Sequence, residues 1–478
     1  MAKKLDRLVE IILTIPSEDH ELEFKRVGNG EGCVADVVES IVGLTNAEGG
    51  MLILGVEDPE KTKSKGVDRI FGIEENINNY DAIGREIQKI IPPLSSIWPP
   101  RKLVADDKTI GILQVPKATD GLRSINNYVY VRQEKSNKRL TPTEVVKFSY
   151  AKGFERADRE LVDVSFKLLD THVFKEWRKS RGIIGKGVAE VLEKVGLARY
   201  SDKKILKPTR AAVLLFAEYP SNLMDTKACV RVLQYMGKTS ETKSLLGTPK
   251  TIEGPVVELI KKAHEYVLSS LRSGVQVPSG FVTRYQIPER AVKEAITNAV
   301  IHRDYHMKRD VEIRIFEDRI EINSPGLFPF NITPANIGLV RSDGWRNDLL
   351  VKHLREFPVP PNLDQNEGVP TMRSEMKSNN LYPPIFYTYP NLQDSVRVTL
   401  LNEKKASEWE KVSAYLEKNK YITNEEARDS TGIVQRDKMS RLLKIWVKQG
   451  LLTKIVPKGG YVKATKYRLP GNRIDATK

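Results

Sequence analysis

The stretch "EAITNAVIHRDY" at Glu294–Tyr305, followed by "VEIRIFEDRIEINSPG" at Val311–Gly326, decides the fold of the second half of the chain. In its first part, Glu294, Asn298 and His302 are spaced four residues apart, which on a helix places them on one face. The second part alternates apolar and polar residues around one acidic turn, which predicts an antiparallel hairpin. The sequence therefore predicts a helix that carries a polar face, followed by two paired strands.

This polar face suggests a binding site for a nucleotide. A carboxylate one turn from an amide can orient a water molecule and a Mg²⁺ ion over phosphates, because Mg²⁺ prefers oxygen ligands and keeps several waters. The alternative is an ordinary polar surface of a helix. His-Arg-Asp at 302–304 also matches a kinase catalytic loop, but the sequence lacks the glycine-rich loop, strand lysine and Asp-Phe-Gly of a kinase.

Length and charge set limits on the class of protein. The 478 residues predict roughly three domains. The net charge of +15 favours binding to nucleic acid, although a basic soluble surface is the alternative. No apolar run approaches the ~20 residues that span a bilayer, and the first apolar stretch, which contains Glu10, is too short for a signal peptide. Cys33 and Cys229 are expected to be reduced buried thiols, so we expect a cytoplasmic protein without a membrane partner.

The first 153 residues alternate helical and strand patterns. "VADVVESIVGLTNAEG" predicts a helix that Gly49-Gly50 ends, and "MLILGVED" a buried strand after it. "TIGILQVPKA" and "NYVYVRQE" predict two more strands. Thr141 and Glu144 have the spacing of a capping box at the start of "TPTEVVKFSYAKG", which predicts a helix.

The middle of the chain is mixed. "SFKLLDTHVFKEWRKSRG", "VAEVLEKVGLARY" and "IEGPVVELIKKAHEYVLSSL" predict helices, and "KPTRAAVLLFAEYP" and "KACVRVLQYMG" predict strands. Residues 330–387 are rich in Pro, Gly and Asn and are predicted to be loop-rich. Loops of this length in compact domains are usually functional lids or disordered segments, and a lid over bound nucleotide fits the leading hypothesis.

The tail predicts a winged helix-turn-helix. Three helical patterns, the second with Thr423 and Glu426 as its capping box, precede a Gly-Gly hairpin. In this interpretation the third helix packs through Leu442, Leu443, Ile445 and Val447. It presents Gln435, Arg436, Lys438 and Ser440 or Arg441 to the major groove of double-stranded DNA, and Lys454, Lys458, Lys463 and Lys466 of the wing bind phosphates. A winged helix that binds only protein is the alternative.

The segment "KEAITNAVIHRDYH…VEIRIFEDRIEINSPGLFP" resembles the N-box, hairpin and turn of a divergent GHKL ATP-binding domain, and "NEGVPTMRSEMKSNNLYPPIF" resembles its downstream glycine box with Gly368. The resemblance implies that Asn298 ligates the Mg²⁺ of bound ATP and that Glu294 positions the attacking water. It places His302 and Arg303 on the phosphate side, and Ser324, Pro325 and Gly326 near the adenine. Typical members have Asp-x-Gly-x-Gly at the adenine turn where this chain has "NSPGL", which leaves Ser324 as a partial substitute for the aspartate.

Near the N-terminus, "EDHELEFKR" at 18–26 and "NAEGGMLILGVED" at 46–58 resemble the Schlafen AlbA_2 domain. In nuclease members, three carboxylates of these motifs bind a divalent metal. By motif position they correspond to Glu18, Glu23 and Asp58, with Lys25 beside them to stabilise charge and with Mg²⁺ or Mn²⁺ as the metal. The other interpretation, which we favour, is that Glu23 and Lys25 are structural and the other two acids are solvated.

Together the motifs predict an α+β multidomain protein. The predicted domains are an AlbA_2-like α/β domain (1–153), a connecting α/β region (154–285), a GHKL (Bergerat-type) α/β sandwich (286–402) and a winged helix-turn-helix (403–478). This arrangement resembles a bacterial family of predicted transcriptional regulators, also described as RecG-like ATP-binding proteins. The leading hypothesis is a regulator in which ATP controls DNA binding. The rivals are an ATP-controlled, metal-dependent nuclease acting on RNA or DNA, with defence against phage as one role, and a scaffold whose nucleotide site is inactive. By analogy with GHKL domains and winged helices, a homo-oligomer is a further expectation.

Overall fold

The computed structural model describes residues 7–30, 32–94, 97–185, 187–224, 226–274, 284–361, 368–419, 421–455 and 465–470. Unit 1 comprises Met1–Lys147, Thr333–Ala335 and Ala406–Lys478, and unit 2 comprises Phe148–Ile332 and Asn336–Lys405. The fold is mixed α/β with several sheets, which confirms the predicted α+β multidomain class. Among the described residues, no helix is long and apolar enough to cross a membrane.

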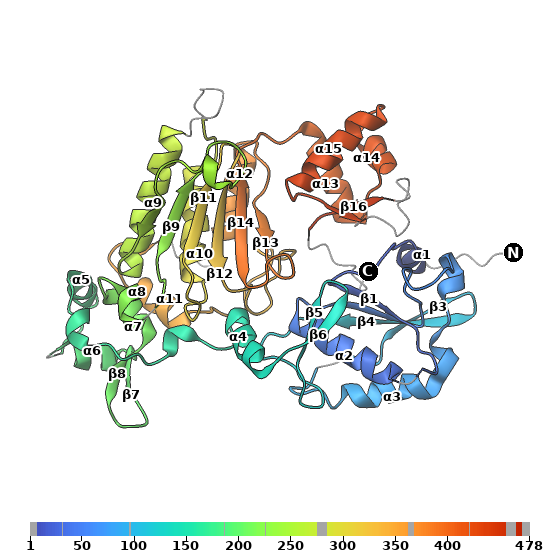
Figure 1. The fold of residues 1–478 in the computed structure, drawn as a ribbon, viewed down its shortest axis with the longest axis horizontal. Helices are drawn as coiled ribbons and strands as arrows, with labels where there is room; N and C mark the ends of the chain where they lie inside the picture. The colour runs from blue at the N-terminus through green and yellow to red at the C-terminus, as the bar shows by residue number, and fades with distance from the viewer. Residues whose placement is uncertain are drawn as a thin grey trace. The chain divides into compact units, whose positions relative to one another are not determined.

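The first sheet of unit 1 has the strand order β1-β2-β4-β3 (Leu22–Lys25, Gly50–Leu54, Lys108–Val115, Arg101–Ala105). Alternate residues of β2 enter two cores: Leu52 and Leu54 pack with α2 (Cys33–Asn46) and α3 (Ile77–Ile87), whereas Met51 and Ile53 pack with α1 (Arg7–Leu13). Figure 1 shows α2 and α3 on one side of this sheet and α1 on the other. The sheet is therefore covered on both faces, which explains why β2 is a continuous apolar run.

The Gly49-Gly50 turn that joins α2 to β2 needs glycine. Both residues have positive φ angles, of 74° and 158°. A Cβ on Gly50 would lie 2.3 Å from the carbonyl oxygen of Glu21, which precedes β1. The predicted helix-to-strand turn is thus confirmed, and its glycines allow β2 to start directly beside β1.

A small hairpin, β5 (Tyr130–Gln133) and β6 (Ser136–Arg139), follows the first sheet, and α4 (Pro142–Lys152) follows the hairpin. The predicted capping box forms, because the backbone N–H of Thr141 donates to Glu144 and that of Glu144 donates to the Thr141 hydroxyl.

The C-terminal part of unit 1 contains three helices and a two-stranded antiparallel sheet: α13 (Ser407–Asn419), α14 (Asn424–Thr431), α15 (Arg436–Lys448), β15 (Thr453–Ile455) and β16 (Lys466–Arg468). The capping box of Thr423 and Glu426 is present. These are the elements expected for a winged helix, and that assignment stays a prediction. The predicted Gly-Gly turn of the hairpin lies outside the described residues.

The packing of α15 differs in part from the prediction. Its buried residues are Met439, Leu443 and Trp446, and Trp446 packs edge-on against Trp409 with ring centroids 5.2 Å apart. Ile445, predicted to pack in the core, is 48% exposed. The spacing of four and three residues fixes the buried stripe, and Ile445 lies off it.

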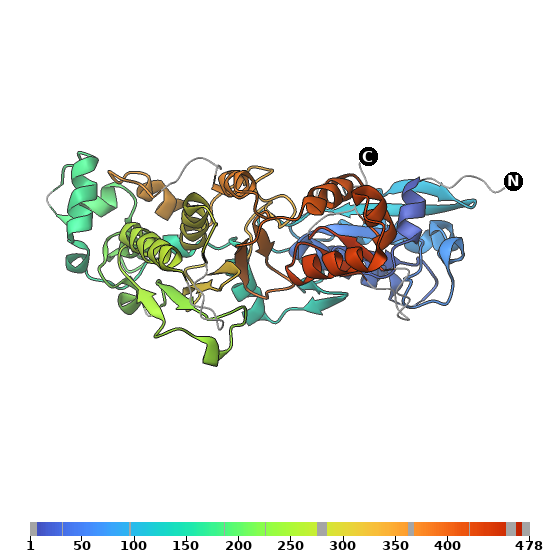
Figure 2. The same cartoon turned by 90° about the horizontal axis from the view of Figure 1, so that it is seen from above.

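Unit 2 is built on a six-stranded sheet of order β10-β9-β11-β12-β14-β13 (Lys250–Ile252, Val230–Gln234, Val311–Ile315, Arg319–Pro325, Ser395–Leu401, Ile385–Tyr387). β11 and β12 form the predicted antiparallel hairpin. Helices α9 (Val256–Ser273), α10 (Glu289–Ile301) and α12 (Gly368–Ser378) form a layer beside the strands (Figure 2). β9 pairs in parallel with β11, so the predicted boundary at residue 285 lies inside a single sheet and helix layer. The four predicted domain ranges stay a prediction.

A smaller part of unit 2 contains short elements that extend its core: α5 (His172–Ser180), α6 (Val188–Lys194), β7 (Ala198–Tyr200), β8 (Leu206–Pro208), α7 (Arg210–Phe216) and α8 (Pro220–Leu223). The segment "KPTRAAVLLFAEYP" was predicted as a strand, and this is wrong over α7. The Thr209 hydroxyl accepts a hydrogen bond from the N–H of Ala212 and caps a helix that is buried on every side. A continuous apolar run fits a buried helix as well as a buried strand.

The segment 330–387 is more regular than the predicted lid. It contains α11 (Asp348–Leu354), α12 and β13, and it packs onto α10 and the sheet. The carboxylate of Asp158 accepts hydrogen bonds from the N–H groups of Leu349 and Leu350 and thereby holds the first turn of α11.

Candidate functional site

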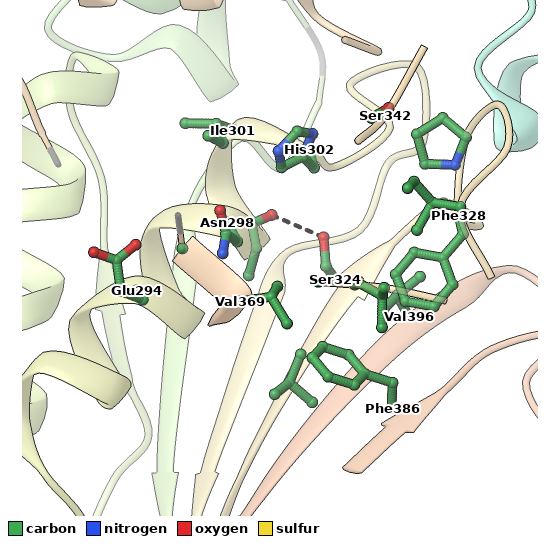
Figure 3. A pocket seen from close by; sticks show the side chains of 18 of the residues that line it. Glu294, Asn298, Ile301, His302, Ser324, Phe328, Ser342, Val369, Phe386 and Val396 are labelled. Atoms are coloured by element: carbon green, nitrogen blue, oxygen red, sulfur yellow. Dashed lines mark hydrogen bonds between the residues drawn. The ribbon is translucent and has the colours of Figure 1, made fainter. Parts of the chain in front are cut away.

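A cavity of about 180 Å³ lies in unit 2 between α10, α12 and one end of the β12–β14–β13 part of the sheet (Figure 3). It is smaller than the ~300–1,000 Å³ of typical ligand pockets. Predicted site residues that line it are Glu294, Asn298, His302, Ser324, Pro325, Gly326 and Gly368.

The predicted polar face of α10 forms one end of this cavity. Figure 3 shows Glu294, Asn298 and His302 following one another along this helix. A Cβ on Gly368 would lie 3.0 Å from Asn298 Nδ2 and 3.1 Å from Glu294 Oε2, so α12 begins directly against both side chains. The start of a helix carries unpaired N–H groups and partial positive charge. This end therefore combines a carboxylate, an amide and a helix N-terminus within contact distance.

His302 lies at the end of α10 and stacks on Trp345, with ring centroids 5.0 Å apart and planes 12° from parallel. Burial, and then the charge of Arg346, lower the pKa of His302 to about 4. The imidazole is therefore neutral at pH 7. A neutral ring can donate or accept one hydrogen bond per nitrogen, but it adds no charge to attract a phosphate.

The other end of the cavity is apolar. Its walls come from β12, β13, β14 and the turn after β12, and their side chains are Ile322, Leu327, Phe328, Phe386, Val396 and Val398. The Ser324 hydroxyl donates to the carbonyl oxygen of Ala299 at 2.8 Å, drawn as the dashed line in Figure 3. The hydroxyl that was predicted to read an adenine is thus bonded to α10.

The turn after β12 is held by backbone contacts. The Pro325 carbonyl accepts from the N–H of Asp304, and the N–H of Leu327 donates to Ala151 at the end of α4, at 2.7 Å each. Gly326 has φ 102°, and a Cβ there would lie 3.0 Å from Asp304 Cβ. Glycine is therefore required at this turn for its conformation and for the close approach.

Arg346, which the sequence analysis missed, anchors the same turn. Its guanidinium donates to the carbonyl oxygens of Tyr150 (2.5 Å), Ala151 (2.6 Å) and Leu327. Burial lowers the pKa of Arg346 to about 10, and the charge of Asp304 opposes this shift. The wall of the cavity is thereby bonded to the end of α4 by a charged group that still carries its proton at pH 7.

Arg303 lies elsewhere than the sequence analysis placed it. It is buried, and its guanidinium donates to the backbone carbonyl oxygens of Lys227, Met307 and Arg309. It follows His302 at the end of α10, so its side chain leaves the helix on another face. In this structure Arg303 holds a loop and does not line the described cavity.

The predicted carboxylates of unit 1 form a second polar cluster. Glu23 on β1 pairs with Lys25 Nζ at 2.8 Å and with Arg132 Nη1 on β5 at 2.9 Å. Burial, and further the charges of Glu23 and Asp58, raise the pKa of Glu18 to about 7, against the N–H of Phe24 and the charge of Arg132. Glu18, Glu23 and Asp58 thus share one neighbourhood.

Cations already balance much of this cluster. Burial alone would lower the pKa of Lys25, but the charges and hydrogen bonds of Glu23 and Asp36 raise it. Asp58 lies 3.7 Å from Lys61. Across the part of the chain that the structure describes, no group of three or more His, Cys, Asp or Glu side chains is arranged to hold a metal ion. The cluster stands in this structure as an ion-pair network. The prediction that Glu18 and Asp58 are solvated is wrong, because both are buried.

The sequence matches two family models. Residues 18–141 match the model described as "Schlafen, AlbA_2". Residues 308–400 match the model described as "Putative ATP-dependent DNA helicase recG C-terminal" (HATPase_c_4). The chain joins an AlbA_2 domain to an ATPase-like domain. Both resemblances drawn from the motifs are thereby confirmed at this level.

Solved structures add a weaker likeness. The crystal structure of the DIP2311 protein from Corynebacterium diphtheriae aligns with 18% identity over 89% of this chain and 76% of that chain, with a TM-score of 0.39. No curated protein matches the chain.

Within the ATPase-like domain, the matched residues include the apolar walls on β12, β13 and β14 and also Gly368. Glu294, Asn298 and His302 on α10 precede the match. Within the AlbA_2 domain, Arg132 is fully buried between Glu18 and Glu23, and the sequence analysis missed it. Nothing in "NYVYVRQE" indicates that role, because Arg132 meets the cluster through contacts with residues of β1 and of the segment before it, which lie far away in the sequence.

The basic residues predicted for DNA binding are mostly exposed. Gln435, Arg436, Lys438 and Arg441 on or before α15 and Lys454 on β15 are exposed. Lys438 lies 3.6 Å from Glu408, and Lys466 is half-buried near the ring of Tyr421. Lys458 and Lys463 lie outside the described residues.

Proposed function

We propose that this chain is a cytoplasmic, nucleotide-controlled, DNA-binding regulator. ATP with Mg²⁺ would occupy the cavity of the ATPase-like domain, and its presence would change how the AlbA_2 domain and the C-terminal helices bind double-stranded DNA. One observation carries the proposal: Glu294, Asn298 and the start of α12 meet at one end of a cavity whose other end is apolar. A nucleotide has the same division between phosphates and base.

Each end of the cavity fits one part of the ligand. The N–H groups at the start of α12 suit phosphate oxygens, and the apolar walls suit a purine ring. Asn298 would hold Mg²⁺ through its side-chain oxygen, a hard donor that this ion prefers, and the ion would neutralise phosphate charge. The carboxylate of Glu294 would orient a water molecule next to the phosphates. Whether ATP is hydrolysed depends on that water.

Support for nucleic acid as the partner comes from charge and from the family models. The chain has a net charge of +15, and exposed Arg436, Lys438 and Arg441 lie together along α15. Contacts between such side chains and phosphates release counterions, so they bind DNA with a strong dependence on salt. The name of the HATPase_c_4 model also refers to DNA. A homodimer would let paired copies of α15 bind two half-sites.

The first experiment measures nucleotide binding. Isothermal titration of the full chain with a non-hydrolysable ATP analogue and Mg²⁺ should show one site, and Asn298→Ala should weaken it at least about tenfold by removing the metal ligand. Asn379→Ala is the matched control, because Asn379 is an exposed amide just beyond α12 whose side chain donates to the carbonyl oxygen of Glu375. Equal loss in both variants, or no binding at all, would contradict the nucleotide site and favour an inactive scaffold.

The second experiment tests the control of DNA binding. The affinity for duplex DNA should fall steeply as the salt concentration rises. The slope of log affinity against log salt should become smaller when Arg436 and Arg441 are replaced by Ala. Replacement of Lys418, which is exposed on α13, should leave the slope unchanged. Adding the ATP analogue with Mg²⁺ should shift the affinity at constant salt, because a ligand that binds two states unequally changes their populations. An affinity that is unchanged by nucleotide would refute the coupling.

A metal-dependent nuclease is the second candidate. The observation in its favour is that the charges of Glu23 and Asp58 raise the pKa of Glu18, which means that the three carboxylates are neighbours. A metal would have to displace the contacts of Glu23 with Lys25 and Arg132. Incubation of RNA and of single- and double-stranded DNA with Mg²⁺ or Mn²⁺ tests it. Cleavage that is lost in Glu23→Ala and Asp58→Ala, and that rises across pH 7 as Glu18 ionises, would support the nuclease and overturn our preference.

A further inference from the structure

We propose that the cavity of unit 2 recognises a purine by shape and by the exclusion of water, without a side-chain hydrogen bond to the base. This inference rests on the proposed nucleotide site and specifies its ligand: the site prefers bases with few polar groups on their edge. It should accept a purine that lacks the 6-amino group of adenine as readily as adenine itself.

The position of the base follows from the two ends of the cavity. Glu294 and Asn298 lie on α10 at the start of α12, away from Phe328 and Phe386 (Figure 3). Phosphates need hydrogen-bond donors and charge, and burying them among aromatic and aliphatic side chains would be costly. The base is therefore the part of the nucleotide that enters the apolar end.

The side chains around the base have little to offer for hydrogen bonding. Ile322, Leu327, Phe328, Phe386, Val396 and Val398 are apolar. The two hydroxyl groups among the described lining residues have local partners: Ser324 donates to Ala299, and Ser342 donates to Gly344 at 2.7 Å. Ser324 is also 8% exposed and enclosed by the sheet and α10, so turning its hydroxyl toward a base would leave the carbonyl of Ala299 without this bond.

A wall of this kind discriminates through desolvation. A polar group that loses water and gains no partner weakens binding. Guanine carries three polar groups on the edge where adenine carries two, and unsubstituted purine lacks the exocyclic amino group altogether. The affinity should therefore rise from GTP to ATP and be at least as high for purine riboside triphosphate. A site with a hydrogen-bond acceptor for the amino group would instead bind ATP more tightly than purine riboside triphosphate.

The test compares three triphosphates on the full chain. With Mg²⁺ present, isothermal titration should give purine riboside triphosphate an affinity equal to that of ATP or up to about tenfold higher, and GTP an affinity at least about tenfold lower than ATP. The ratio of purine riboside triphosphate to ATP should be the same in Ser324→Ala, since the hydroxyl bonds to α10 in either case.

The outcomes separate this inference from the proposed function. ATP that binds more than about tenfold tighter than purine riboside triphosphate would overturn the inference and leave the nucleotide site standing. If Ser324→Ala then removes that preference, Ser324 is the reader of the base. If none of the three binds, the proposed site fails and the inference fails with it.

Discussion

His302 is a residue whose pKa ties the stability of unit 2 to pH. Burial, followed by the charge of Arg346, lowers this pKa to about 4, whereas an unfolded histidine titrates near 6.5. Between these values the unfolded chain binds a proton that the folded chain does not, so stability is lost as the pH falls from about 6.5 toward 4. Between pH 7 and pH 5, the free energy of unfolding should fall by about 1–2 kcal/mol less in His302→Gln than in the wild type. Urea unfolding at the two pH values measures this difference.

His264 provides the matched control for this prediction. Its pKa is also lowered to about 4 by burial, but its ring contacts Lys293 and Thr297 and lies outside the cavity. His264→Gln should reduce the dependence of stability on pH in the same direction and leave nucleotide binding unchanged. If His302→Gln retains the full pH dependence, the histidine is not buried in its neutral form.

Single residues also show how far sequence patterns reach. The spacing of four residues was sufficient to place Glu294, Asn298 and His302 in one cavity, because a helix fixes their direction locally. Arg303 is adjacent in sequence yet bonds to other loops. Trp345 joins the cavity by stacking on His302 from a distant segment, and no local pattern could predict it.

At the scale of elements, the start of α12 depends on the absence of a side chain at Gly368. A Cβ there would press on Asn298 Nδ2 at 3.0 Å and on Glu294 Oε2 at 3.1 Å. We predict that Gly368→Ala folds, because alanine favours a helix, but binds the ATP analogue at least about tenfold more weakly, as titration would measure. Gly187→Ala, at the start of α6 with nothing within 4 Å of its added Cβ, should bind normally. Normal binding by Gly368→Ala would mean that α12 does not approach the ligand.

The helix α7 depends on its capping residue. Thr209 is fully buried, and its hydroxyl accepts from Ala212 N–H and donates to the Leu197 carbonyl at 3.0 Å. We predict that Thr209→Val lowers the free energy of unfolding of unit 2 by about 1–3 kcal/mol, as measured by urea unfolding, because it removes the cap and leaves buried polar groups unpaired. Thr209→Ser keeps the hydroxyl and should be close to the wild type. Equal losses in both variants would point to the methyl group instead.

Elements were predictable where a local signal was decisive. The capping boxes at Thr141 and Thr423 marked true helix starts, and the period of two marked β11 and β12. The apolar run of α7 was ambiguous because a buried strand and a buried helix share it, and only the Thr209 cap distinguishes them. The pairing of β9 with β11 joins segments that are about 80 residues apart, which sequence periodicity does not encode.

At the scale of the whole molecule, Arg468 ties the C-terminal part of unit 1 to the residues just before its first strand. Arg468 on β16 is 5% exposed and lies 3.0 Å from Asp19 and 3.6 Å from Glu21. We predict that Arg468→Ala destabilises unit 1 by about 1.5–3 kcal/mol, because it leaves the buried carboxylate of Glu21 and the partly exposed carboxylate of Asp19 without this cation. Amide hydrogen exchange should then become faster at β1, at β16 and around Tyr421, because these backbone segments lie beside the contact. Exchange in unit 2 should stay unchanged.

Two further variants identify the cause. Arg468→Lys retains the charge and should lose less stability than Arg468→Ala. In Arg468→Ala with Asp19→Asn, the second change should restore part of the stability, because an amide needs no cation beside it. If the double variant is as unstable as the sum of the two single variants, Arg468 acts through packing and not through its charge.

The contact between Arg468 and Asp19 also joins two residues that are synthesised at very different times. The two residues are 449 positions apart. At a synthesis rate of about 5–20 residues per second, Asp19 is incorporated roughly 20 to 90 s before Arg468. The first sheet can form during that interval, but its acidic edge can meet Arg468 only after β16 has been translated. Any pause or early stop in translation would therefore leave a nascent AlbA_2 domain with this edge uncovered and open to chaperones and proteases.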